Sequence, residues 1–372
     1  MSNNIDLKRT NQNEVFRYIY FQNHPVSKYD LMKNLDLSLP TVNMIIKYFT
    51  ENHYLYDCGT FDSQGGRPPK AFTYNTSLRH AIGLDITQHH IHIVMTDLSG
   101  SIIAKKKFRQ SFTADDTYYV HLSNVVESMI SSTGIARDTI LGIGIALPVM
   151  VNFSEQITLH SNLTVFKDIS VEKFVHYLHF PCMICNDANA GGLAEQWNNR
   201  DMKNAFYLSL NNTVGGAILQ NHRLYFGETY ESGEIGHVTL VNNGRLCYCG
   251  KHGCVDAYIS ALILSNSAGG SLDAFFKHID EGSTYHINIW NEYLEYLTIT
   301  INNLKMLFDC SVIAGGYVGP YLEKHTDTIK KLLIQRNTYH EEAEYFKICK
   351  FKRYSTAVGA ALLNIEKFLK TV

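Results

Sequence analysis

The sequence predicts an α/β protein in which a small N-terminal helical module is followed by two larger α/β lobes. Three features indicate this. Apolar residues recur at helical spacing over 42–49. Apolar and polar residues alternate over 81–104, as in a strand meander. The near-continuous apolar run at 141–148 is typical of a buried strand in an α/β sheet. At 372 residues, the chain is long enough for two or three domains with cores of their own.

Residues 1–78 carry the signals of three helices and a hairpin. We expect a helix over 11–23, and Ser27 and Ser38 are placed to cap the starts of two more. Two short strands then flank the tip Gly65-Gly66-Arg67-Pro68-Pro69. Two capped helices joined by a short turn predict a helix-turn-helix, and the hairpin makes it winged. The second helix of such a unit can enter a DNA major groove, and an arginine on the wing suits the minor groove.

The predicted DNA contacts come from the second capped helix and the wing tip. They are Ser38, Thr41, Asn43, Lys47 and Arg67. The alternative is a helical dimerisation module that never touches DNA. Roughly eight Lys and Arg against roughly seven Asp and Glu leave this module a net charge of only about +1, which favours that alternative. The order of elements and the Gly-Gly-Arg tip favour DNA binding.

The next lobe, 79–186, opens with a strand meander that carries Asp85 near the end of its first strand. An actin-like sugar kinase begins in the same way, with a glycine-rich turn after the aspartate whose N–H groups approach the nucleotide phosphates. Here that turn is Ile86-Thr87-Gln88-His89-His90, which has no glycine. Side chains occupy the space that phosphates need, so we expect no ATP binding and no enzymatic activity. Asp85 by itself could equally be a strand-end carboxylate without function.

A second stretch with candidate functional residues is a short apolar strand that delivers Asn186 and Asp187 to its C-terminal end. Strand ends of open α/β sheets are where ligands bind. An aspartate there can act as a general base or hold a sugar hydroxyl. The alternative is that Asp187 only caps the helix that follows. Upstream, Asn162 lies on a loop before another predicted helix, and we include it among the candidate ligand contacts.

One histidine and three cysteines gather in a glycine-rich stretch. They are His237, Cys247, Cys249 and Cys254. Thiolates and a neutral imidazole suit zinc, and four such ligands close a tetrahedral structural site. The alternatives are unrelated small residues in a loop, or a metal-sensing site. Two carboxylates, Glu234 and Asp256, flank the cluster.

These motifs resemble, over essentially the whole chain, the ROK family of bacterial sugar-responsive repressors and sugar kinases. The wing tip looks like that of the repressor branch, which includes xylose repressors. His237 and the three cysteines match the family's zinc ligands. The resemblance implies that Asn186, Asp187, Glu234 and His237 contact sugar hydroxyls, and that zinc orders the sugar site. In the family's kinases, the residue at position 187 is the catalytic base.

The sequence departs from the family pattern at several points. The residue two after the last cysteine is usually Glu in the family and is Asp256 here, one methylene shorter. The second phosphate turn of the family, Gly-Thr-Gly, is Asn211-Asn-Thr213 here, and Pro148 precedes Val149 where a glycine is usual. The nucleotide half of the site is therefore predicted to be lost, whereas the sugar half is retained.

We therefore expect a sugar-responsive DNA-binding transcriptional regulator, most simply a repressor of a carbohydrate-utilisation operon. The expected architecture is a winged helix-turn-helix over 1–78 and a two-lobed actin-like fold. One lobe spans 79–186 with 356–372, and the other spans 187–355. The expected partners are operator DNA, a sugar and a second copy of the chain, because palindromic operators suit dimers. The alternative is an ATP-dependent sugar kinase of the same family that carries a DNA-binding module.

The apolar stretches and the cysteine content also predict the cellular compartment of the protein. No N-terminal apolar run resembles a signal peptide, and the longest apolar stretch is too short and too glycine-rich to span a bilayer. Eight cysteines without a secretion signal indicate a reducing compartment. We expect a cytoplasmic protein without a membrane partner. The formal net charge of −2 gives the chain as a whole no bias toward nucleic acid.

Overall fold

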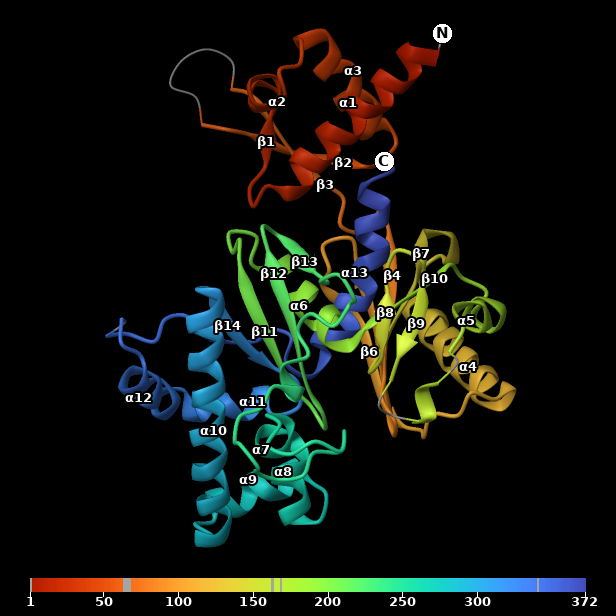
Figure 1. Cartoon of the computed structure of the whole chain (residues 1–372). Helices are drawn as coiled ribbons and strands as arrows, with labels where there is room; N and C mark the ends of the chain where they lie inside the picture. Colours follow the sequence, from red (N-terminus) through yellow and green to blue (C-terminus); the bar gives the residue numbers. More distant parts are fainter. Residues whose placement is uncertain (1, 63–67, 162–163, 168, 340) are drawn as a thin grey trace.

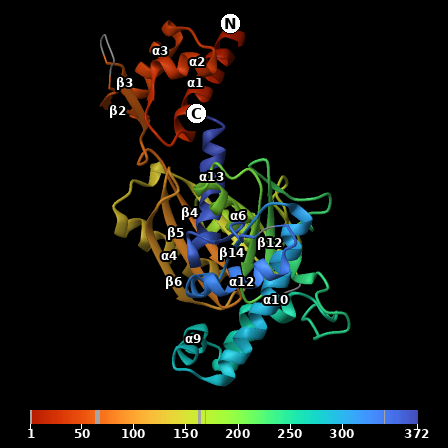
Figure 2. The same cartoon turned by 90° about the vertical axis from the view of Figure 1, so that its left-hand side faces the viewer.

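The computed structural model describes residues 2–62, 68–161, 164–167, 169–339 and 341–372. Two five-stranded sheets form the body of the molecule, and a smaller N-terminal module stands at one end of it (Figure 1). Figure 2 shows the same separation from the side, with the C-terminal end of the last helix pointing toward the module. None of the helices in the described ranges has both the length and the apolar character needed to cross a membrane.

The N-terminal module contains three helices and a three-stranded sheet of order β1-β3-β2. Its elements are α1 (Ser2–Phe21), β1 (Val26–Ser27), α2 (Lys28–Leu35), α3 (Leu39–Glu51), β2 (Leu55–Thr60) and β3 (Lys70–Tyr74). The capping box is present, because Ser27 Oγ accepts from the Asp30 N–H and the Asp30 carboxylate accepts from the Ser27 N–H. Ser38 caps α3 in the predicted place, and the apolar stripe 42–49 is buried. The first helix starts well before the predicted residue 11.

The first five-stranded sheet has the order β10-β7-β4-β5-β6. Its strands are β4 (His80–Ile86), β5 (His90–Asp97), β6 (Ile102–Arg109), β7 (Ile140–Leu147) and β10 (Cys182–Asn186). Helices α4 (Asp116–Thr133) and α5 (Val171–Leu178) share a core with one face of the sheet. The other face is covered by α13 (Ser355–Leu369), which lies so close that a Cβ at Gly83 or Gly144 would overlap its backbone carbonyls.

The second five-stranded sheet has the order β13-β12-β11-β14-β15. Its strands are β11 (Ala205–Leu210), β12 (Val214–Gln220), β13 (Arg223–Tyr225), β14 (Ser311–Gly315) and β15 (Phe346–Ile348). Helix α6 (Asp187–Asn198) and α13 lie between the two sheets (Figure 1). The two helices touch closely, because a Cβ at Gly359 would overlap the carbonyl oxygen of Ala190.

The remaining elements complete the two lobes. They are the hairpin β8 (Met150–Asn152) and β9 (Ile157–His160), and the helices α7 (Asp256–Ile259), α8 (Ala261–Ser265), α9 (Leu272–Asp280), α10 (Thr284–Phe308), α11 (Gly319–Leu322) and α12 (Thr326–Arg336). The apolar pattern over 262–279 is helical, but the structure divides this segment between α8 and α9. The chain breaks between α8 and α9 because Gly269 and Gly270 take positive φ values of 65° and 86°, which end a right-handed helix.

The N-terminal module is anchored on the body by α1. Phe16 packs edge-on against Phe368 of α13, and the Tyr20 hydroxyl donates to the Leu98 carbonyl oxygen at 2.7 Å. Arg200, just after α6, donates to the Tyr20 carbonyl oxygen at 2.7 Å. Its guanidinium also lies over the rings of Tyr20, Phe21 and Trp197. We call Tyr20, Phe21, Trp197 and Arg200 the Arg200 joint.

Candidate functional site

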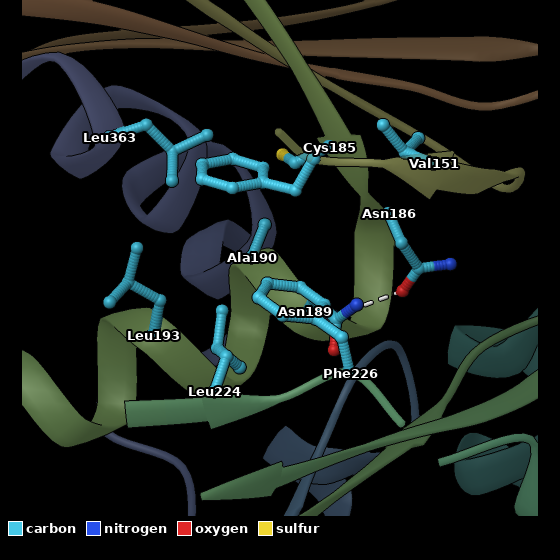
Figure 3. Close-up of a pocket in the computed structure, with 10 residues that line it drawn as sticks. Val151, Cys185, Asn186, Asn189, Ala190, Leu193, Leu224, Phe226 and Leu363 are labelled. Carbon is cyan, nitrogen blue, oxygen red and sulfur yellow. Dashed lines mark hydrogen bonds between the residues drawn. The ribbon is translucent and has the colours of Figure 1, made fainter. Parts of the chain in front are cut away.

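The site is built around the first turn of α6. Asn186 ends β10 and caps the helix, because its Oδ1 accepts from the Asn189 N–H at 3.0 Å (Figure 3). Its Nδ2 donates to the Val149 carbonyl oxygen at 3.2 Å, which ties the helix start to the loop after β7. The capping role thus belongs to Asn186. The Asp187 side chain accepts only from the N–H of Ala188, at 2.9 Å, among the hydrogen bonds of the described residues.

Behind Asn186, helix α6 packs against apolar side chains that line a small cavity. Figure 3 shows side chains from β10, α6, β13 and α13 around this small cavity, with Leu193, Leu224 and Leu363 facing one another. The rings of Phe153 and Phe226 stack across it at 5.7 Å, one from each lobe. Apolar packing on this side holds the Asn186 turn in place against the cleft on its other side.

A cleft of about 590 Å³ opens on that other side, between the loop after β7 and the start of β12. Backbone at Gly215 and Gly216 forms part of its wall. Its polar lining side chains are His160, Ser161, Asn186, Asp187, Thr213, Glu234 and Tyr248. Three of the predicted ligand contacts, Asn186, Asp187 and Glu234, therefore share one cleft. Asn162 lies outside the described residues.

Two carboxyl groups dominate the electrostatics of the cleft. Burial raises the pKa of Asp187 to about 7, and the charges of Asp85 and Glu234 add to the shift. Burial and the charge of Glu231 also raise the pKa of Glu234, whereas His160 lowers it. Within the described ranges, no Lys or Arg lines the cleft. Such a surface suits hydroxyl groups and repels anions.

The four predicted metal ligands come together beside this cleft. One donor atom from each of His237, Cys247, Cys249 and Cys254 lies within 4.8 Å of the others. The sulfurs of Cys249 and Cys254 are 3.8 Å apart. In a tetrahedral site with Zn–S bonds of about 2.3 Å, two sulfurs are about 3.8 Å apart, so the spacing and the donor set fit zinc.

The loop that carries the cysteines depends on a glycine. Gly253 has a φ of +81°, and a Cβ there would overlap the Val241 carbonyl oxygen. The Gly253 N–H donates to the Arg245 carbonyl oxygen at 2.8 Å, and the Cys247 N–H donates to that of Lys251 at 2.8 Å. These backbone bonds fold the loop back on itself and direct the sulfurs to one point.

Tyr248 joins the metal cluster to the cleft, and sequence reasoning missed it. It stands between two ligands, Cys247 and Cys249, and lines the cleft. Its hydroxyl is 3.2 Å from His237 Nε2. The signal that could have found it is its place between two cysteines that must converge. His160 was missed too, because nothing in its surroundings in the sequence marks a ligand.

Asp256 does not line the cleft. Its carboxylate is buried and accepts from the Val214 N–H at 2.6 Å, which supports the start of β12 next to Gly215 and Gly216. Burial raises the pKa of Asp256 to about 6. Direct contact between Asp256 and a ligand stays a prediction, and the geometry favours an indirect role through the backbone of β12.

Asp85, whose charge acts on Asp187, has a partner of its own. His92 lies directly across the β4–β5 pair, and its Nδ1 is 3.0 Å from Asp85 Oδ2. Both side chains are buried, at 1% and 7% exposure. The rings of Tyr317 and Tyr354 pack edge-on against His92. The carboxylate that would face a nucleotide in a kinase is therefore engaged by an imidazole.

Four of the five predicted DNA contacts lie on α3 or at its N-cap. Asn43 accepts from Lys28 Nζ at 2.7 Å, and Lys47 pairs with Glu51 at 3.8 Å. Ser38 and Thr41 share a hydrogen bond at 2.8 Å at the helix start. Ser38, Asn43 and Lys47 are exposed, whereas Thr41 is half-buried. Arg67 lies outside the described residues.

Comparison with known proteins identifies the family. The sequence pattern of the ROK family matches residues 81–367. The chain is 28% identical to a xylose repressor of Bacillus spizizenii over 98% of its own length and 97% of that protein. It is 26% identical to the transcriptional dual regulator NagC of Escherichia coli over 68% of its length and 63% of that protein.

Solved structures share the fold. A ROK family transcriptional regulator, described as a homologue of the Escherichia coli MLC protein, superposes with a TM-score of 0.76 at 18% identity and covers 98% of both chains. A ROK glucokinase from Streptomyces griseus, solved with glucose and AMPPNP, gives a TM-score of 0.63 at 21% identity over 76% of this chain and 98% of that one. Since the family pattern spans most of the chain, the protein belongs to the ROK family.

Proposed function

We propose that this protein is a sugar-responsive transcriptional repressor that binds DNA through its N-terminal module and a sugar in the cleft at the start of α6. The observation that carries the proposal is the combination, in one chain, of two capped helices with a hairpin and a cleft of hydroxyl-binding groups. The full-length similarity to a xylose repressor supports it.

The N-terminal module acts as a winged helix-turn-helix. Helix α3 presents Thr41, Asn43 and Lys47 to the major groove, Ser38 contacts a phosphate near the helix start, and Arg67 enters the minor groove from the wing. The boundary of this domain falls near residue 78, before β4. The body then divides into the lobe 79–186 with 356–372 and the lobe 187–355.

Asn186, Asp187, Glu234 and His237 hold the sugar, and Asn162 is a further contact. A structural zinc ion on His237, Cys247, Cys249 and Cys254 fixes the His237 ring. Asp256 contributes by holding the start of β12. When bound, the metal supplies rigidity at the wall of the cleft rather than chemistry on the sugar.

The sugar is uncharged. A phosphate group in the cleft would meet Asp187 and Glu234, and no lysine or arginine of the described lining offsets them. Phosphate recognition in proteins depends on cationic side chains or on helix N-termini free of nearby carboxylates. The N-terminus of α6 carries Asp187 itself, so it does not offer such a site.

The second candidate function is sugar phosphorylation, and Asp187 favours it, because a carboxylate at this place can serve as a general base. The Asp85–His92 pair and the lack of glycines over 86–90 favour the repressor. The protein acts as a homodimer in the cytoplasm, since two helix-turn-helix modules match a palindromic operator.

A paired experiment tests the proposal. Gel shifts with the DNA upstream of the protein's own gene are measured with xylose, glucose and N-acetylglucosamine, and ATP consumption is measured with the same sugars. We expect DNA binding that at least one sugar changes, and no ATP consumption. Sugar phosphorylation at ordinary enzymatic rates would refute the purely regulatory function, and a lack of DNA binding under every condition would refute the repressor.

A further inference from the structure

The loop 247–254, which carries the three cysteines, places the Tyr248 hydroxyl next to the His237 ring that the proposed zinc site would hold. Tyr248 is 48% exposed, and its ring centroid is 5.4 Å from that of His237. Its hydroxyl oxygen is 3.2 Å from His237 Nε2, within hydrogen-bonding distance. The side chain also lines the cleft that contains Asp187 and Glu234.

The tautomer of His237 follows from this contact. Because Nε2 lies 3.2 Å from the Tyr248 hydroxyl, we assign the other ring nitrogen, the buried Nδ1, as the metal donor. A metal on Nδ1 leaves the ring proton on Nε2, and a neutral ring then has one N–H donor. The Tyr248 oxygen accepts from that donor, and a sugar hydroxyl on His237 would need the same donor.

We propose that Tyr248 occupies the place of a sugar hydroxyl on His237 and thereby sets the affinity of the protein for its effector. The inference rests on the proposed function, in which a sugar binds this cleft and contacts His237. On binding, the half-exposed ring turns toward solvent and the sugar hydroxyl takes its place on Nε2. The backbone of the loop stays fixed, because the Cys247 and Gly250 N–H groups remain bonded to the carbonyl oxygens of Lys251 and Cys247.

Because Tyr248 is half-exposed, a role in controlling access to His237 fits it better than a role in core packing. A ring buried in the core could not move without disrupting its neighbours, but nearly half of this side chain already faces solvent. The two neighbouring cysteines position its Cα, so the metal cluster fixes where the hydroxyl can reach. Tyr248 thus lowers the affinity of the cleft for any sugar that must displace it from His237.

The test removes only the hydroxyl. Tyr248→Phe keeps the ring and loses the competing hydrogen bond, which is expected to tighten sugar binding about fivefold. Isothermal titration of xylose, glucose and N-acetylglucosamine into the zinc-loaded, full-length protein measures this. Tyr225→Phe is the matched control, because Tyr225 is 49% exposed and stands on β13 outside the cleft, and it should leave the sugar affinity unchanged.

Zinc content and melting temperature are measured on each variant. A Tyr248→Phe protein with wild-type zinc content and tighter sugar binding supports the inference. The same protein with unchanged or weaker binding overturns it, while sugar binding by the wild type keeps the proposed function intact. If none of the sugars binds either protein, the proposed cleft function and the inference both fail. Tyr248→Ala gives a second check, since it must also bind at least as tightly as the wild type.

Discussion

Replacing Arg200 with alanine is expected to separate sugar binding from the DNA response. Helix α6 begins in the cleft with Asp187, and the Arg200 joint follows its other end. A helix is stiff along its axis, so a displacement of its first turn by a sugar also moves Trp197 and Arg200 against α1. At the joint, the end of α6 meets α1 of the N-terminal module, which we propose binds DNA.

The size of the effect follows from the contacts of Arg200. Its hydrogen bond to the Tyr20 carbonyl oxygen involves a charged donor and contributes about 1.5–3 kcal/mol. Its position over the aromatic rings contributes roughly 0.5–1 kcal/mol more at a partly exposed site. A sugar that weakens DNA binding 100-fold requires about 2.7 kcal/mol of coupling. Loss of the joint is therefore large enough to reduce such a response to a few-fold.

The assay compares two affinities in one protein. Calorimetry measures sugar binding, and fluorescence anisotropy of labelled upstream DNA measures DNA binding with and without sugar. Arg200→Ala should keep the sugar affinity and lose most of the change in DNA affinity. Arg223→Ala is the control. Arg223 lines the same surface groove as Phe21, Trp197 and Arg200, so its replacement removes the same charge there, but it is not a member of the Arg200 joint. A full sugar response in Arg200→Ala would refute coupling through this joint.

Three further predictions concern the metal, the buried carboxylate and the helix pair. Cys249→Ser should release zinc and lower the melting temperature, whereas Cys58→Ser, at an exposed site far from the cluster in sequence, should change neither. Because the folded-state pKa of Asp187 is raised to about 7, the folded protein keeps a proton that the unfolded chain has lost. The free energy of unfolding should therefore fall as the pH rises from about 4 to 7, and Asp187→Asn should flatten that fall in urea titrations. Gly359→Ala should destabilise the protein by about 3 kcal/mol, since its new Cβ would overlap the Ala190 carbonyl oxygen, and an unchanged urea midpoint would contradict this.

Local patterns predicted the helical starts well, because caps and apolar stripes act within one element. Ser38 and the buried stripe of α3 are where the sequence places them. The two-residue strand β1 was not foreseen, because so short a strand has no period of its own and exists only through pairing with β3. The break at Gly269 was missed for a related reason, since apolar spacing continues across it while the backbone reverses its φ.

In the candidate site, too, some features could be predicted from local sequence and others could not. The convergence of His237 with the three cysteines could be predicted because three of the four lie in one short loop, and such a donor set has few other uses. The partnership of Asp85 with His92 depends on strand register, which a sequence alone leaves open. The direction of Asp256 was also out of reach, because the Val214 N–H that it binds comes from a distant strand.

The Asp85–His92 pair also limits which substitutions the protein can accept at these two positions. Removing one member of a buried hydrogen-bonded pair typically costs about 1–3 kcal/mol, since the other polar group is left without that partner in the interior. Glycines placed in the 86–90 turn would leave His92 hydrogen-bonded to Asp85, and removal of His92 would leave Asp85 without this partner while the charge of Asp187 is nearby. Neither change alone is expected to stabilise this part of the sheet. Asp85 and His92 are therefore expected to tolerate substitution together better than one at a time.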